Sequence, residues 1–172
     1  PQPAMNAQLC LEDCFCFDTS ALSNMWNTDY RPAAFPSVWE VLSQAIAVKA
    51  AIAPREVYLE LERTRDAEML QWVKEHRAMF RADTRELVQA VIALEREFPN
   101  LIECDKEPYD ADPWVIALAE VAGAAVVTAE KDTGTRAGGM NKPRVKIPDV
   151  CRARGIRLAT VSDFVEARGK AL

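Results

Sequence analysis

The 172-residue sequence has only six glycines and one histidine, and it contains no long apolar run. Its longest uninterrupted apolar stretch, residues 121–127, is far shorter than the roughly 20 residues that a membrane-spanning helix needs. Few glycines beside ten prolines disfavour a small barrel with tight turns and favour helices that begin at proline. With 49% hydrophobic and 27% charged residues, the composition excludes collagen and disorder and is typical of a globular domain.

Several motifs of catalysis and cofactor binding are also missing. Neither a Walker phosphate loop nor a G-x-G-x-x-G dinucleotide loop is present. The single histidine, His76, lies in a polar helical stretch and is expected at the surface, which makes a Ser-His or Cys-His centre hard to build. The five cysteines do not have the spacing of a zinc site. With no signal peptide in evidence, we expect buried, free thiols in a reducing cytoplasm.

The net charge of −5 conceals an uneven distribution along the chain. Residues 131–172 carry ten Lys and Arg against four acids, a local charge of +6, so residues 1–130 carry −11. A basic C-terminal quarter suits a polyanionic partner, and an acidic body suits cations. A basic surface that is merely solvated is the alternative.

Short apolar segments alternate with amphipathic ones along the whole chain. Four segments are expected as strands: 14–17, 51–53, 124–128 and 156–161. The first lacks polar alternation and is expected to be buried on both faces, and 124–128 is also expected to be buried. Helical patterns separate them at 18–26, 36–46, 54–61, 66–99 with a break near 80–84, 112–123, 149–154 and from a cap at Ser162. This order predicts a single α/β domain over residues 1–172, a three-layer α/β/α sandwich with a central parallel sheet. Residues 131–147 form a basic loop within it.

Acidic residues follow these elements where a parallel sheet binds its ligands, beyond the carboxyl ends of the strands. Asp18 and Glu130 come after predicted strands, while Glu60 and Asp112 lie on helices that enter or leave the sheet. Carboxylate oxygens are the ligands that Mg²⁺ and Mn²⁺ prefer. Each acid has an ordinary alternative: Asp18 and Asp112 as helix caps, and Glu60 and Glu130 as solvated surface groups.

Six stretches in order resemble the PIN-domain ribonuclease superfamily, in particular a PIN-like bacterial family of unknown function. They are residues 16–22, 52–61, 111–119, 126–130, 146–151 and 155–160. The resemblance covers nearly the whole chain and implies a PIN-like fold. It also implies a Mg²⁺- or Mn²⁺-dependent endoribonuclease that hydrolyses RNA to 5′-phosphate ends, as the toxin of a toxin–antitoxin pair. RNA and an antitoxin protein are then the expected partners, a homodimer stays open, and no membrane is involved.

The resemblance also assigns roles to residues. Its catalytic and metal-binding acids fall on Asp18, Glu60, Asp112 and Glu130. The family commonly has Asp at the place of Glu130, so Asp132 nearby is the alternative fourth acid. Thr19, Ser20 and Asp110 are expected in supporting positions.

The basic loop supplies the predicted RNA contacts. Lys142, Arg144 and Lys146 alternate over five residues, so an extended chain presents all three on one edge toward phosphates. The competing hypothesis is a non-catalytic PIN-like module that binds RNA or protein, with this loop as a docking surface for a partner.

Overall fold

A five-stranded, all-parallel sheet forms the centre of the computed structural model, which describes residues 14–101, 110–132 and 145–169. Its strands are β1 (Phe15–Phe17), β2 (Ala51–Pro54), β3 (Phe80–Arg81), β4 (Ala125–Val127) and β5 (Leu158–Ala159). They lie in the order β3-β2-β1-β4-β5, and every pair is parallel. The predicted α/β fold with a parallel sheet is confirmed.

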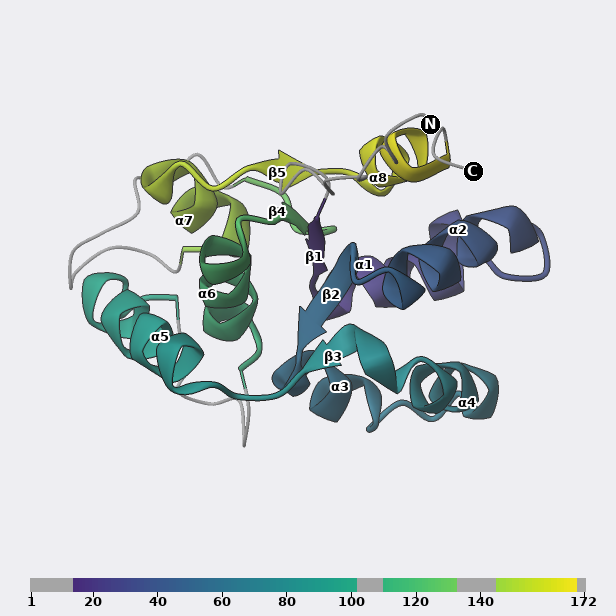
Figure 1. Ribbon diagram of the computed structural model, residues 1–172, viewed down its shortest axis with the longest axis horizontal. Coiled ribbons are helices and arrows are strands. Elements are labelled where there is room, and N and C mark those ends of the chain that lie inside the picture. Colours follow the sequence, from purple (N-terminus) through teal and green to yellow (C-terminus); the bar gives the residue numbers. More distant parts are fainter. Residues whose placement is uncertain (1–13, 102–109, 133–144, 170–172) are drawn as a thin grey trace, which may run out of the picture.

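Helices cover both faces of this sheet (Figure 1). Helices α5 (Arg85–Glu97), α6 (Asp112–Ala122) and α7 (Ile147–Arg154) lie on one side. On the other side lie α1 (Thr19–Asn24), α2 (Pro36–Ala47) and α8 (Val161–Gly169), while α3 (Arg55–Leu61) and α4 (Ala67–Glu75) lie near the β3 edge. A π-helical segment, Met25–Asp29, extends α1, and a 3₁₀ turn, Arg77–Met79, precedes β3. The result is the expected three-layer sandwich.

The central strands are buried on both faces, as their lack of polar alternation predicts. Phe15 and Phe17 point to one face and pack edge-on against the Phe164 ring of α8, with centroids 5.3 and 5.1 Å away. Cys16, on the opposite face, donates its thiol to the Val115 carbonyl of α6 at 3.6 Å. Alternating side chains of one short strand thus hold both helical layers.

The amphipathic patterns locate the helices well. All six apolar residues expected on the inner face of α2 are buried: Val38, Trp39, Val41, Leu42, Ala45 and Ile46. Helix α6 ends at Gly123, whose φ of 65° is the left-handed conformation expected of a glycine C-cap.

Three local expectations were wrong, and one strand was missed. The break at 80–84 contains the edge strand β3, and Pro54 ends β2 instead of opening α3. Thr160, rather than Ser162, caps α8, because its hydroxyl accepts from the Asp163 N–H at 3.0 Å. His76 is half-buried: its ring stacks on Trp72 at 4.3 Å, and Nε2 lies 2.8 Å from the Ser43 hydroxyl. Among the described helices, none has the length and apolar character needed to cross a membrane.

Candidate functional site

The carboxyl ends of the parallel strands meet at one edge of the sheet, and polar residues follow two of them there. The register pairs Phe17 of β1 with Val127 of β4, so that Asp18 and Thr128 leave the sheet at the same level. The Asp18 N–H continues the ladder by donating to the Val127 carbonyl at 3.1 Å. Side chains that are 110 residues apart in sequence thereby become neighbours.

Asp18 is the centre of this group, and its side chain is held from three directions. One oxygen, Oδ1, accepts from the Ala21 N–H at 2.6 Å, which makes Asp18 the N-cap of α1. The other, Oδ2, accepts from the Ser20 and Thr128 hydroxyls, both at 2.7 Å. Asp18 is therefore both a helix cap and a fixed carboxylate at the sheet edge.

The carboxylate of Asp18 is buried in spite of its charge, with only 3% of the residue exposed. Burial raises its pKa from 3.8 to about 6, against the lowering effect of the hydrogen bonds from Ala21, Thr128 and Ser20. The charge of Glu130 adds to the rise. The site thus keeps an anion where the surrounding protein disfavours one.

Glu60 joins this edge from helix α3. Its Oε2 accepts from the hydroxyl of Thr19, the residue next to Asp18. Its Oε1 accepts from the N–H of Ala111, the residue next to Asp112, at 3.2 Å. Glu60 is half-buried and connects the start of α1 with the start of α6, so it is not a solvated surface group.

Asp112 is the first residue of α6 and not its cap, so the helix-cap alternative for this residue was wrong. Ala111 occupies the N-cap position without a side-chain bond, and the Asp112 N–H donates to Asp110 Oδ1 at 3.1 Å. The Oδ2 atom of Asp112 is buried. Asp110 thus accepts a hydrogen bond in the turn that precedes α6, and its supporting role at a site stays a prediction.

Glu130 lies on the other side of Asp18 and holds the start of helix α7. Its Oε2 accepts from the Ile147 N–H at 3.1 Å, and Oε1 lies 3.7 Å from Lys146 Nζ. Its own N–H donates to the Thr128 hydroxyl, which in turn donates to Asp18. Lys146 is therefore an ion-pair partner of a candidate acid, while Lys142 and Arg144 lie outside the described residues.

Asp132, the alternative fourth acid, belongs to a separate ion-pair group. It pairs with Arg152 of α7, which also donates to the buried Asp149 at 3.4 Å. Asp149 in turn accepts from the Lys146 N–H at 2.9 Å. Of the two alternatives, Glu130 has the hydrogen-bonded connection to Asp18.

The sequence analysis missed one participant of this edge, Thr128, and one buried acid of α3 outside it, Glu56. Thr128 connects Asp18 with Glu130, but a threonine after a strand is too common to single out. Glu56, one turn before Glu60, is 4% exposed, and burial raises the pKa of its carboxyl group. Its Oε2 has no hydrogen-bond partner among the described residues.

The edge thus gathers carboxylate and hydroxyl oxygens, the donor type that hard divalent cations prefer. These carboxylates are occupied by hydroxyl, amide and ammonium donors of the protein itself. Within residues 14–101, 110–132 and 145–169, no three His, Cys, Asp or Glu side chains have an arrangement that holds a metal ion directly. Hydrogen bonds of Thr19 and Thr128 connect Glu60 and Glu130 to the start of α1, and Asp112 is linked to Glu60 through the N–H of its neighbour Ala111.

Comparison with known families places nearly the entire described chain in one family. Residues 15–172 match the model described as "Domain of unknown function (DUF4411)", so the chain belongs to that family. No curated protein matches the chain significantly.

Proposed function

We propose that this protein is a PIN-like, Mg²⁺- or Mn²⁺-dependent endoribonuclease. One observation carries the proposal: three other segments, which carry Glu60, Asp112 and Glu130, are connected by hydrogen bonds to the region of the buried Asp18 at the carboxyl edge of the sheet. Thr19, Thr128 and Ala111 connect Glu60, Glu130 and the start of α6 to that centre.

The electrostatics of this edge support a cation. Burial is the main cause of the raised pKa of Asp18, and the negative charge of Glu130 adds to it, so a cation at this edge would stabilise the charged carboxylate. Such an arrangement is typical of sites where a metal ion neutralises the charge. All the donors are oxygen atoms, which fits magnesium and manganese and not zinc.

Asp18, Glu60 and Asp112 would hold the cation, with Glu130 completing or extending the site. When bound, the metal would lower the pKa of a water molecule and neutralise charge on the leaving oxygen during RNA hydrolysis. The chain's own groups orient the ligands: Ser20 and Thr128 fix Asp18 Oδ2, while the Ala111 N–H fixes Glu60 Oε1. Lys142, Arg144 and Lys146 would contact RNA phosphates.

The resemblance of the sequence to the PIN-domain superfamily also suggests a biological role. A cytoplasmic toxin, restrained by an antitoxin protein, is the role it implies, with a homodimer as an open alternative to the monomer. Free thiols at Cys14, Cys16 and Cys151 agree with a reducing compartment.

RNA cleavage by the purified chain tests the activity. We expect Mg²⁺ or Mn²⁺ to support cleavage of a labelled RNA to 5′-phosphate ends, and EDTA to abolish it. Asp112→Asn removes a charged ligand from the candidate site, so it should abolish cleavage. Asp83→Asn is the matched control, because Asp83 pairs with Arg55 near β3 and takes no part in the candidate site. Equal rates for wild type and Asp112→Asn would contradict the assignment.

The second candidate is a non-catalytic PIN-like module that binds RNA or protein. The engagement of the site carboxylates by protein donors favours it, because a metal ligand must give up such bonds. Calorimetric titration with Mn²⁺ separates the two: the nuclease predicts binding that Asp18→Asn removes, and the module predicts none.

A further inference from the structure

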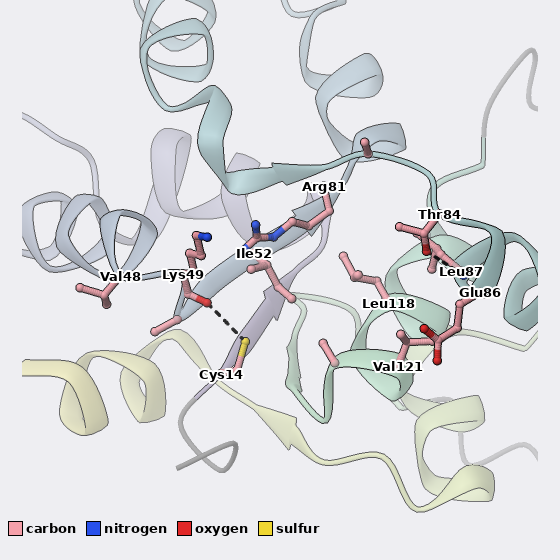
Figure 2. Close-up of a pocket in the computed structure, with 13 residues that line it drawn as sticks. Cys14, Val48, Lys49, Ile52, Arg81, Thr84, Glu86, Leu87, Leu118 and Val121 are labelled. Atoms are coloured by element: carbon pink, nitrogen blue, oxygen red, sulfur yellow. Dashed lines mark hydrogen bonds between the residues drawn. The ribbon is translucent and has the colours of Figure 1, made fainter. Parts of the chain in front are cut away.

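A second concave surface lies on the helix α6 side of strands β2 and β3 (Figure 2). It is a groove of about 680 Å³, within the range of about 300–1,000 Å³ typical of small-molecule sites. Its walls are mostly apolar, with Ile52 on the sheet, Leu118 and Val121 on α6, and Leu87 on α5. None of the four candidate metal ligands lines it.

The groove exposes apolar surface to solvent. Val48 and Val121 are 47% and 39% exposed, and both lie at its rim. Between them the walls of the hollow are apolar, and a concave, mostly apolar lining is typical of small-molecule sites. The hollow therefore favours a ligand with an apolar body.

Two cations stand at one end of this apolar surface. Figure 2 shows the side chains of Lys49 and Arg81 pointing toward one another over Ile52. Neither is paired with a carboxylate among the described residues. Burial raises the pKa of the Cys14 thiol at the same end, and the nearby Arg81 guanidinium opposes that rise. An anionic group would complete this end.

Lys49 occupies its place against the preference of its backbone. Its φ of 62° is left-handed, the conformation that glycine usually supplies at the end of a helix. The Lys49 and Ala50 N–H groups close α2 by donating to Ile46 and Ala45, at 3.0 and 2.8 Å. A lysine here strains the backbone, as residues at ligand sites often do.

The opposite end of the groove carries the other sign of charge. Glu86, in the first turn of α5, lies beside Val121 and far from the two cations in the view of Figure 2. A ligand with an anionic group at each end would meet this carboxylate. The groove therefore favours a single anionic head group.

We propose that this groove binds a small amphipathic monoanion, an apolar chain with one carboxylate. The head group lies between Lys49 and Arg81, and the chain covers Ile52, Leu118 and Val121. The site is separate from the acidic edge and requires no metal ion.

Calorimetry with dodecanoate, below its micelle concentration and in EDTA, tests the proposal on the full chain. We expect one site per chain. Dodecyltrimethylammonium and dodecanedioate, matched in chain length, should each bind at least tenfold more weakly. Equal binding of the cationic amphiphile would overturn the assignment of the head-group site, and absence of dodecanoate binding would overturn the groove as a ligand site.

Paired variants locate the binding. Arg81→Gln should weaken dodecanoate binding about tenfold through loss of a charge-assisted hydrogen bond, while Arg96→Gln, on the exposed face of α5, should not. Val121→Glu should abolish binding, and Ile92→Glu, at another exposed apolar position outside the groove, should leave it unchanged. Equal losses within either pair would refute the location.

The Lys49→Gly variant should change stability and dodecanoate binding in opposite directions. Glycine relieves the left-handed strain, so the thermal midpoint should rise while dodecanoate binding weakens. A variant that binds as well as the wild type would overturn the role of Lys49. Because this variant is expected to be more stable, weaker binding cannot be attributed to poor folding.

Discussion

Replacement of Asp18 by Asn tests the candidate site through stability rather than through activity. Asn keeps the shape of the side chain and remains a good N-cap for the Ala21 N–H. Its amide group can donate to the Ser20 and Thr128 hydroxyls, which rotate to accept. The change therefore removes a buried charge and little else.

The size of the effect follows from the pKa of Asp18. A rise from 3.8 to about 6 means that the charged form costs the folded state about 3 kcal/mol, at about 1.4 kcal/mol for each pH unit. A raised pKa favours folding fully below pH 3.8, and this contribution is lost as the pH rises through about 6. The amide of the Asp18→Asn variant carries no charge, so the variant should be more stable than wild type by about 2 to 3 kcal/mol at pH 8, and nearly equal at pH 4.

Urea denaturation in EDTA at the two pH values measures this difference. Added Mn²⁺ should then stabilise the wild type by mass action and leave Asp18→Asn unchanged, so that the gap at pH 8 narrows. A variant less stable than wild type at pH 8 in EDTA would refute the reasoning, because Asp18 would then be a favourable charged cap and nothing more.

Asp66→Asn is the matched control, since Asp66 caps α4 but is accessible to water. The Met69 N–H and the Trp26 indole N–H hold the pKa of Asp66 below 3.8. Its favourable contribution exists above pH 3.8 and is lost as the pH falls through the lowered pKa. The control should therefore lose stability at pH 8 and change less at low pH, the opposite sign to Asp18→Asn.

Three further outcomes are expected. Glu60→Gln keeps an oxygen that can accept from the Ala111 N–H, so circular dichroism should show an intact fold while calorimetry shows loss of Mn²⁺ binding. Thr128→Val removes a hydroxyl donor to the Asp18 carboxylate and should cost about 1 to 3 kcal/mol in urea denaturation, more at pH 8 than at pH 4, because a bond to a charged acceptor is stronger. Gly123→Ala meets no atom within 4 Å but must adopt a φ of 65°, so thermal unfolding should show a loss of about 1 to 2 kcal/mol from backbone strain alone.

The sequence predicted those helices and strands whose apolar residues form a clear pattern within the element itself. The apolar stripe of α2 has a helical period, and the apolar runs of β1, β2 and β4 have no polar alternation, so the sequence identifies all four as core elements. Strand β3 was not predictable, because its two half-buried residues, Phe80 and Arg81, have no period to detect. Its place depends on its pairing with Ala53 and Pro54, which are distant in sequence.

The sequence indicated where Asp18 lies, but it did not indicate the hydrogen-bond partners of the candidate acids. Asp18 follows a strand, so its place at the edge could be expected from the sequence. The partners of Glu60 come from α1 and α6, and nothing local to Glu60 specifies them. Asp112 was open to misreading as a cap because Asp110, two residues earlier, offers the carboxylate that accepts its N–H.

The pairing of β1 with β4 also sets the order in which the edge can be assembled during synthesis. Asp18 leaves the ribosome first, but the Thr128 hydroxyl that fixes it is made 110 residues later. Because synthesis proceeds at about 5–20 residues per second, Thr128 is added roughly 5 to 20 seconds after Asp18. A chain that has not yet reached this point therefore lacks β4 and Thr128 beside Asp18, even if its first helices have formed. Any chemistry performed at that edge is therefore withheld until residue 128 has been synthesised.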